Sequence, residues 1–276
     1  QVSPSFNSYN FIPRILEICE QFGVQCLIPV IDEELLMFAS HREDFEKRNI
    51  KLIINNKGTI RLTKNKYLTR KFCEKENILA PKTFLKKDIK DLDTQKLNYP
   101  LIIKPLVGRG SRDVVKIKNK KELYFFKDYF DNFIIQEFIE GQEYTIDIVA
   151  SPCGRVLQAI PRKRIETKAG MSYKAMITKD RRLIDYGMYI AKKFHIDGPA
   201  NIQCMVNKKG IYLIEVNPKF AAGLPLTVAA GVNIPLLLVK LAFGLKVKEE
   251  ELDFKDKIFM LRYWEEAFVP EEEIFK

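Results

Sequence analysis

The chain has 276 residues, of which 46% are hydrophobic and 30% charged, so it has enough apolar residues for one large core or for two or three small domains. No run of about 18 apolar residues occurs, so no transmembrane helix is expected, and the first residues lack the basic and apolar segments of a secretory signal. The net charge of +10 suits polyanions from nucleic acid to nucleoside triphosphates; because the basic residues are not interleaved with aromatic ones, a nucleic-acid partner is not expected.

The five cysteines are scattered along the chain and never form a CxxC pair. This spacing argues against a zinc site and against a disulfide framework, and a cytoplasmic location is therefore expected. The chain begins at Gln1 rather than at methionine, so we expect it to be cut or incomplete at its start.

The N-terminal region alternates helix and strand, which is typical of an open α/β sheet. Four predicted segments, in order a helix, a strand, a helix and a strand, make up this pattern: Ile12–Phe22, Cys26–Val30, Glu33–Lys47 and Lys51–Asn55. Gly23 would end the first helix. Because one such unit is too small for a whole nucleotide-binding domain, we expect further strands before residue 1.

A glycine-rich loop lies between two predicted strands in the middle of the chain. A helix over Thr63–Asn77, with Thr63 as its N-cap, precedes a strand over Tyr99–Pro105. The loop GlyArgGlySer at 108–111 then leads to a strand over Val114–Ile117. Because there is no GxGxxG or GKS/T motif and a strand follows, the loop suits a lid that offers backbone amides to phosphates. A plain hairpin turn fits the same residues.

The second half of the chain alternates strands and helices around a cationic segment. The predicted elements are a helix over Lys120–Tyr129, strands over Phe133–Ile139, Glu143–Ala150 and Arg155–Pro161, and helices over Leu183–Phe194 and Pro235–Phe243. Residues 162–172, which include two arginines and two lysines, are predicted to form a loop. Such a loop is able to hold a carboxylate or a phosphate through charge-assisted hydrogen bonds. An ordinary solvated loop is the alternative.

The segment Ala200–Pro218 is predicted to form a β-hairpin. Apolar runs flank a polar turn, and a three-residue loop over Lys208–Gly210 would set the register. One face of the paired strands then consists of Asn201, Gln203, Glu215 and Asn217, and the buried face of Ile202, Cys204, Ile214 and Val216. A carboxylate and three amides suit a Mg²⁺ site that shares phosphate oxygens, although an ordinary solvent-facing hairpin explains the same pattern.

Taken in order, these motifs resemble those of the ATP-grasp superfamily, and within it proteins similar to the carbamoyl phosphate synthetase large chain. The resemblance covers nearly the whole chain and depends on five segments: 99–105, 108–111, 134–147, 198–203 and 215–233. It implies an α/β and α+β chain with the ATP-grasp fold. Its parts would be a truncated, Rossmann-like pre-ATP-grasp domain over 1–62, a small lobe with the phosphate lid over 63–140, and a C-terminal lobe with the metal site over 141–276.

The resemblance also implies a nucleotide site, with ATP and Mg²⁺ (or Mn²⁺) as cofactors. Lys66 and Lys104 match residues that meet the α- and β-phosphates. The lid is expected to consist of Gly108, Arg109, Gly110 and Ser111, and the adenine-binding hinge of Glu137, Phe138 and Ile139. Glu143 matches the acid that takes the ribose hydroxyls. The implied metal ligands are Gln203, Glu215 and Asn217.

Two residues are implied to act in catalysis, Lys219 and Arg164. The family usually has arginine where this chain has Lys219; lysine keeps the charge but loses the planar two-pronged geometry. Arg164 would bind the substrate carboxylate and the developing acyl phosphate, with Arg162 and Lys168 as weaker candidates.

The reaction that the resemblance implies is a MgATP-dependent ligation, in which a carboxylate is activated as an acyl phosphate and attacked by an amine. The partners would be a small-molecule acid and amine; self-association is left open. Such chemistry needs cations around the γ-phosphate rather than a protein nucleophile. Two alternatives stay open: phosphorylation of bicarbonate or another small acid, as in carbamoyl phosphate synthetase, and a non-catalytic ATP-binding module.

Overall fold

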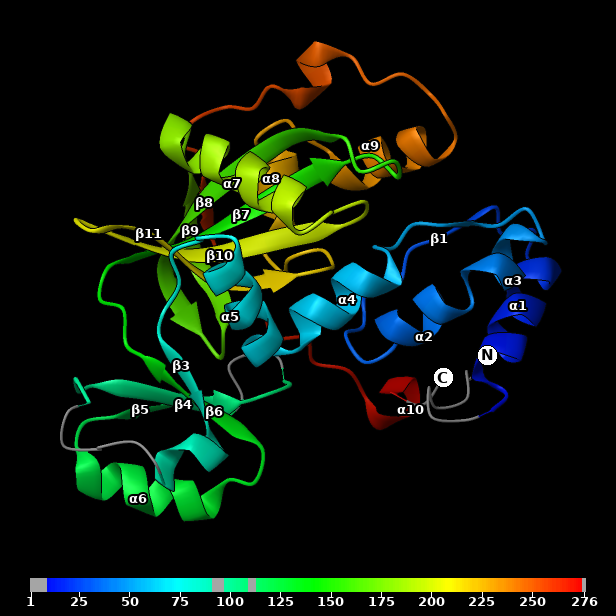
Figure 1. Ribbon diagram of the computed structural model, residues 1–276. Coiled ribbons are helices and arrows are strands. Elements are labelled where there is room, and N and C mark those ends of the chain that lie inside the picture. The colour runs from blue at the N-terminus through cyan, green and yellow to red at the C-terminus, as the bar shows by residue number, and fades with distance from the viewer. Residues whose placement is uncertain (1–8, 91–96, 109–112, 275–276) are drawn as a thin grey trace.

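The computed structural model describes residues 9–90, 97–108 and 113–274, and Figure 1 shows their sheets with helices around them. The described strands are β1 (Cys26–Leu27), β2 (Lys51–Leu52), β3 (Thr83–Leu85), β4 (Leu101–Pro105), β5 (Val115–Ile117), β6 (Phe133–Glu137), β7 (Gln142–Ala150), β8 (Val156–Lys168), β9 (Met171–Ile177), β10 (Ala200–Asn207), β11 (Gly210–Asn217) and β12 (Phe259–Leu261). The described helices are α1 (Phe11–Gln21), α2 (Leu35–Ser40), α3 (Arg42–Glu46), α4 (Lys57–Lys64), α5 (Lys66–Lys75), α6 (Lys120–Tyr129), α7 (Arg181–Lys193), α8 (Leu224–Ala229), α9 (Ile234–Ala242) and α10 (Glu271–Ile274). None of these helices is both long and apolar enough to span a membrane.

The N-terminal elements form a small α/β unit, to the right in Figure 1. β1 and β2 pair in parallel, which confirms the predicted α/β character of this region. The single helix expected over Glu33–Lys47 was wrong: it is interrupted at His41, whose backbone (φ −110°, ψ 19°) leaves the helical region, so α2 and α3 form instead. Both short helices still bury an aromatic ring, Phe38 and Phe45, in one cluster.

Two successive helices, α4 and α5, connect this unit to the rest of the chain. The predicted single helix with Thr63 as its N-cap was wrong, since Thr63 lies inside α4 and its hydroxyl donates to a carbonyl of the preceding turn. Asn65 is the N-cap of α5: its side-chain oxygen accepts hydrogen bonds from the backbone amides of Tyr67 (3.0 Å) and Leu68 (3.1 Å). The corner at Asn65 places Lys66 at the first position of α5.

The small lobe is an antiparallel sheet in the order β3, β6, β4, β5, with α6 below it in Figure 1. α6 has the bounds that the sequence predicts, and Asn119 caps it. Alternate residues of β4 lie on opposite faces of the sheet. Leu101 and Ile103 are buried in the cluster that includes Leu123 of α6, so Ile102 and Lys104 face the other way.

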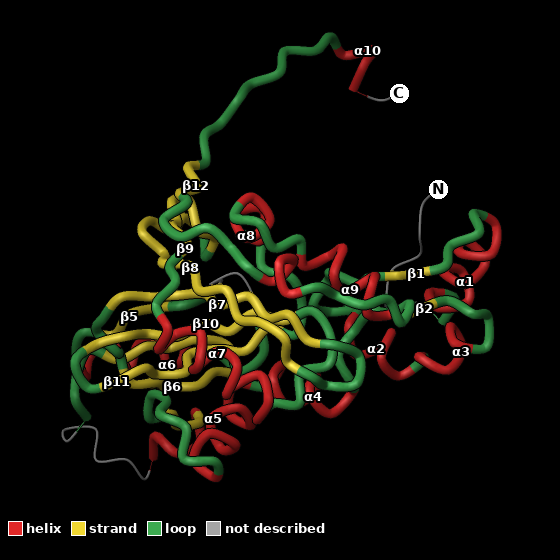
Figure 2. Tube along the Cα trace, turned by 90° about the horizontal axis from the view of Figure 1, so that it is seen from above, coloured by secondary structure: helices red, strands yellow, loops and turns green. Residues whose placement is uncertain are grey.

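The large lobe is a six-stranded sheet in the order β11, β10, β7, β8, β9, β12. The cationic loop predicted over 162–172 was wrong, because β8 continues to Lys168 and β9 begins at Met171. The reversal needs only Ala169 and Gly170, which have φ angles of +47° and +75°. Beyond β12, the chain extends away from the sheets (Figure 2). The arginines of residues 162–172 therefore lie on a strand, where alternation places Arg162 and Arg164 on one face.

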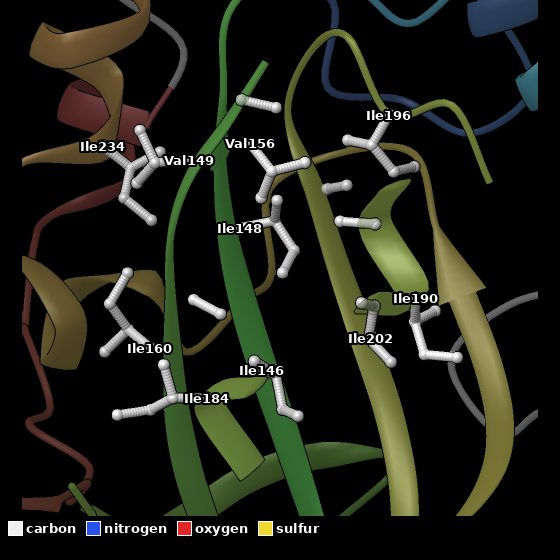
Figure 3. Packing of buried hydrophobic residues seen from close by; sticks show 14 of the residues in the cluster. Ile146, Ile148, Val149, Val156, Ile160, Ile184, Ile190, Ile196, Ile202 and Ile234 are labelled. Carbon is white, nitrogen blue, oxygen red and sulfur yellow. The ribbon is translucent and has the colours of Figure 1, made fainter. Parts of the chain in front are cut away.

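The main core packs on both faces of this sheet: α7 covers one face, and Ile234 of α9 packs beside Val149 on the other (Figure 3). Even-numbered residues of β7, such as Ile146 and Ile148, are fully buried with Ile202 of β10 and Ile190 of α7. The odd-numbered residues of β7 face the opposite side of the sheet. On that side Val149 is also buried in the core, whereas Thr145, nearer the start of β7, lines a cavity.

α7 packs so closely on the sheet that glycine is required at position 187. A Cβ atom there would lie 2.7 Å from Cγ2 of Ile146 and 2.9 Å from Cβ of Ala159. Replacing Gly187 with alanine is expected to lower the free energy of unfolding by about 1–3 kcal/mol, because overpacking outweighs the better helix propensity of alanine. Denaturant unfolding measures this. The control Lys192→Ala, on the exposed side of α7, should change the free energy by less than about 0.5 kcal/mol; equal effects of the two changes would contradict the packing argument.

Candidate active site

A cavity of about 390 Å³, here called the inter-sheet cavity, lies between the four-stranded and the six-stranded sheets. Side chains from both sheets line it, among them Ile102, Lys104, Gln136, Glu143, Gln203 and Glu215. Neither lobe contains this site alone. Residues that are far apart in the sequence meet there because the two sheets face each other.

Two lysines lie at one end of the inter-sheet cavity. The Nζ of Lys66 donates a hydrogen bond of 3.1 Å to the carbonyl oxygen of Gly108, which ties the start of α5 to the glycine-rich loop. Lys104 is only 7% exposed. Burial lowers the pKa of Lys104 from 10.5 to about 8; the charge of Glu215 opposes this shift and that of Lys66 adds to it. The cavity therefore has a buried amine that is poised to gain a negative partner.

Residues at the end of β6 and just after it also line the cavity: Glu137, Phe138 and Ile139. The carboxylate of Glu137 accepts a hydrogen bond from the backbone amide of Lys82 (3.3 Å), which fixes that side chain. Ile102 and Met205 add apolar surface. An apolar slot with adjacent backbone groups suits a flat heterocyclic ring.

Glu143 and Arg164, which the sequence assigned to different substrates, form an ion pair with each other. The Nη1 of Arg164 donates to Oε1 of Glu143 at 2.6 Å, and Nη2 donates to the carbonyl oxygen of Gly170 at 2.7 Å. Burial raises the pKa of the Glu143 carboxyl, and Arg164 opposes that rise. The Nε of Arg164 is buried without a hydrogen-bond partner in the described structure. Glu143 and Gly170 therefore fix the guanidinium of Arg164 in the wall of the cavity.

The hairpin of β10 and β11 has the predicted register where it matters for the site. Asn201 pairs with Asn217 and Gln203 with Glu215, so these side chains share one face, as expected. The predicted three-residue loop was wrong: Asn207 pairs with Gly210, which leaves a two-residue turn.

A bulge restores the predicted pairing. The register shifts between Gln203 and Cys204, which places Leu213 opposite Cys204 and leaves Ile214 unpaired. Leu213 is buried where Ile214 was expected, and Ile214 lines the inter-sheet cavity instead. Bulges often redirect a side chain beside a site in this way.

A second cavity of about 240 Å³, here called the Asp32 cavity, adjoins the first. It shares four lining residues with the inter-sheet cavity: Arg164, Gly170, Gln203 and Glu215. Asp32 reaches it from the segment after β1, and its Oδ2 forms an ion pair with Nζ of Lys219. The N-terminal unit thus contributes a carboxylate to a cavity of the large lobe.

Arg162 forms a fixed wall of the Asp32 cavity. Its Nε and Nη2 donate to the two carboxylate oxygens of Asp147, both at 2.8 Å, and the hydroxyl of Thr227 donates to Oδ2 of Asp147 at 2.5 Å. Arg162 and Asp147 are 1% and 2% exposed. A Cβ atom at Gly223 would collide with Nη1 of Arg162. Since its charge is already paired, Arg162 is a positioning group rather than a free anion receptor.

A family model described as "ATP-grasp in the biosynthetic pathway with Ter operon" matches residues 129–266, half of the chain. The chain belongs to the ATP-grasp family. A second model, described as "PylC-like, N-terminal domain", matches residues 1–53.

Sequence relatives of this ATP-grasp protein include carbamoyl phosphate synthases. The large chain from Thermoanaerobacter pseudethanolicus is 27% identical over 228 residues, which is 75% of this chain but 21% of the relative. A carbamoyl-phosphate synthase from Methanobrevibacter smithii is 27% identical over 272 residues, with 90% of this chain and 72% of the relative covered. The chain therefore spans only about a fifth of the large chains that it matches.

Solved structures agree on the ATP-grasp fold. The biotin carboxylase domain of the Hydrogenobacter thermophilus 2-oxoglutarate carboxylase superimposes with a TM-score of 0.76 at 16% identity, covering 94% of this chain and 62% of that one. The L-amino acid ligase from Bacillus licheniformis superimposes with a TM-score of 0.69 at 19% identity, covering 91% of this chain and 65% of that one. The fold predicted from the motifs is thus confirmed.

The ATP-grasp residues named from the sequence fall into three groups. The inter-sheet cavity brings together Lys66, Lys104, Gly108, Glu137, Phe138, Ile139, Glu143, Arg164, Gln203 and Glu215. Asn217 and Lys219 line the Asp32 cavity. Arg109, Gly110 and Ser111 lie outside the described residues. The individual roles of these residues, and the three-part division at residues 62 and 140, stay predictions.

Asp32 is the residue of this ATP-grasp site that the sequence analysis missed. It follows the parallel strand β1, and ligands of open α/β sheets bind beyond the carboxyl ends of their strands. Its position after a predicted strand was therefore a signal from which a ligand-binding role could have been predicted. The pairing of Asp147 with Arg162 had no such signal, because both residues lie inside strands whose alignment the sequence did not predict.

Proposed function

We propose that this protein is an ATP-dependent carboxylate–amine ligase. The supporting observation is the junction of its two cavities at Gln203 and Glu215. The inter-sheet cavity would hold ATP with its phosphates toward Lys66 and Lys104, and the Asp32 cavity would hold the acid. The γ-phosphoryl group and the carboxylate would then meet at the junction.

The metal-ligand hypothesis fits the donor set of the hairpin face. Glu215 supplies one carboxylate, and Gln203 and Asn217 supply amide oxygens, which are ligands that Mg²⁺ accepts alongside phosphate oxygens and water. The amide nitrogen of Asn217 donates to Oδ1 of Asn201 at 3.3 Å, which orients its own oxygen away from that contact. When bound, Mg²⁺ would neutralise charge on the phosphate oxygens.

The chain's own residues would position and stabilise the reacting groups. Lys104 and Lys66 would hold the phosphates, and Lys219 would attract the carboxylate and the phosphoryl group. Arg164, which lines both cavities, would stabilise the charge of the acyl phosphate. No protein nucleophile is required, since positioning and charge stabilisation supply the catalysis of phosphoryl transfer.

A second candidate is phosphorylation of bicarbonate. It is supported by the relative from Methanobrevibacter smithii named carbamoyl-phosphate synthase, of which this chain covers 72%. ADP release that depends on bicarbonate, without any organic acid, would favour this function.

The proposed ATP site is tested by heat denaturation with and without MgATP. A ligand that binds only the native state at about 100 times its Kd adds about 2.7 kcal/mol to the free energy of unfolding. We therefore expect MgATP to raise the Tm by several degrees and ATP without Mg²⁺ to raise it less. ADP release is then screened with pools of acids and amines. No change of Tm at millimolar MgATP would contradict the site; a shift without ADP release under any pool would favour a non-catalytic module.

A further inference from the structure

The Asp32 cavity contains a carboxylate and an ammonium group side by side, and we propose that it binds a zwitterionic acid of the α-amino acid type as the substrate to be phosphorylated. This inference rests on the proposed ligase function and narrows its substrate class. Asp32 and Lys219 form an ion pair, yet their side chains stay 20% and 23% exposed. Both line the cavity, so each has an open side for a ligand.

The distribution of charge distinguishes this cavity from a site for a simple acid. The other two cations on its wall have carboxylate partners that do not line it: Arg162 pairs with Asp147, and Arg164 with Glu143. Lys219 has its partner within the cavity. A simple anion at Lys219 would therefore meet the like charge of Asp32 at contact distance, which is unfavourable.

A zwitterion turns that repulsion into attraction. An α-amino acid has its ammonium group one carbon from its carboxylate, so the two charged groups are as close together as the two members of the ion pair. Its carboxylate would contact Lys219 and its ammonium group Asp32, with charge-assisted hydrogen bonds at both ends. Phe220, Ala222 and Ser172 line the same cavity and would contact the rest of the molecule.

The size of the cavity and its place in the site agree with this class. Its volume of about 240 Å³ is below the range of roughly 300–1,000 Å³ for pockets of drug-sized ligands, so it suits a small acid. Glu215 and Asn217, the proposed metal ligands, line it too. A carboxylate at Lys219 would thus lie beside the phosphoryl group that it attacks.

The test separates the acid from the natural amine by using hydroxylamine, which is uncharged near neutral pH. A carboxylate oxygen bonds to the γ-phosphorus of ATP, and the bond from that phosphorus to the ADP oxygen breaks. The hydroxylamine nitrogen then bonds to the carbonyl carbon, the bond to phosphate breaks, and the nitrogen loses a proton to the buffer. The products are ADP, inorganic phosphate and a hydroxamate that ferric ion detects.

Each common α-amino acid, in L and D form, is compared with the 2-hydroxy acid that has the same side chain and configuration, which lacks the ammonium group and does not react with hydroxylamine. ADP release with bicarbonate is measured in parallel. We expect hydroxamate from at least one amino acid, with kcat/KM at least about tenfold above that of its 2-hydroxy acid, the effect of one charge-assisted contact. A response confined to 2-hydroxy acids or bicarbonate would overturn the inference and leave phosphorylation of an acid intact. No response to any acid would remove the proposed function and the inference with it.

The variant Asp32→Asn assigns the effect to this side chain. We expect KM for the amino acid to rise at least about tenfold while KM for the 2-hydroxy acid stays equal or falls, because the repulsion is removed. The control Asp44→Asn changes a carboxylate of the same N-terminal unit that lines neither cavity and should keep both KM values. Retention of the MgATP-dependent rise in Tm shows that Asp32→Asn is folded. If the folded Asp32→Asn variant has the wild-type KM for the amino acid, the inference is overturned. That result is expected if Asp32 binds the amine substrate instead.

Discussion

Replacing Glu215 with alanine is expected to lower ADP release in the presence of acid and amine by at least about 100-fold, the loss typical when one preorganised charge-stabilising group is removed. Glu215 is the carboxylate shared by both cavities. It also opposes the lowering of the Lys104 pKa, so its loss would leave Lys104 less often protonated. The variant should therefore lose both the metal ligand and part of the charge that holds the phosphates.

The matched control for this prediction is Glu250→Ala. Glu250 is a glutamate on the surface, 72% exposed in its side chain, and lies outside both cavities. The Glu250→Ala variant should release ADP at the wild-type rate. Full turnover by Glu215→Ala would remove Glu215 from the metal site.

The second large effect is expected at Lys104, and it depends on pH. Replacing Lys104 with methionine is expected to raise KM for ATP about 100-fold, because loss of one member of a buried charge pair costs about 2–5 kcal/mol. In the wild type, the pKa of about 8 means that the free enzyme loses this charge as pH rises above 8. KM for ATP should therefore increase above pH 8 in the wild type, and this increase should be absent from Lys104→Met.

The same lysine should also affect the free energy of unfolding. As pH rises, its contribution should increase, whereas the affinity for ATP decreases. The pKa of Lys104 is lower in the folded chain than the ordinary value of 10.5, so between about pH 8 and 10.5 the unfolded chain binds more protons at this residue. Without ATP, the contribution of Lys104 to the free energy of unfolding rises through that window. Lys192→Met, at an exposed lysine of α7, is the control and should keep the wild-type KM and its pH dependence. An equal pH dependence in Lys104→Met and the wild type would assign it to another group.

Local patterns in the sequence were sufficient to predict most of the helices and strands and the order of the motifs. The two-residue period of a strand is independent of what the strand packs on, so the shared face of Gln203 and Glu215 was predictable. The structure differs from the predicted hairpin in two ways, a shorter turn and a bulge at Ile214. Because the two differences cancel in the register, the pairing of Gln203 with Glu215 is as predicted. The same local approach failed at 162–168, where polar residues suggested a loop. These residues form a strand because they pair with the neighbouring strands β7 and β9. They are polar because Arg162, Arg164 and Thr167 line the cavities rather than the core.

The contacts that give the site its chemistry lie between residues that the sequence does not relate. Asp32 and Lys219 are 187 positions apart, and Arg162 and Thr227 meet at Asp147 from different elements. The pKa of Lys104 depends on its burial between two sheets and on the distance to Glu215. Periodicity and motif spacing describe the chain within a few residues of each position, whereas desolvation and Coulomb interaction depend on distance in space. For that reason the motifs predicted candidates for nucleotide binding and for metal ligation, but only the folded chain brought a carboxylate from the N-terminal unit to Lys219.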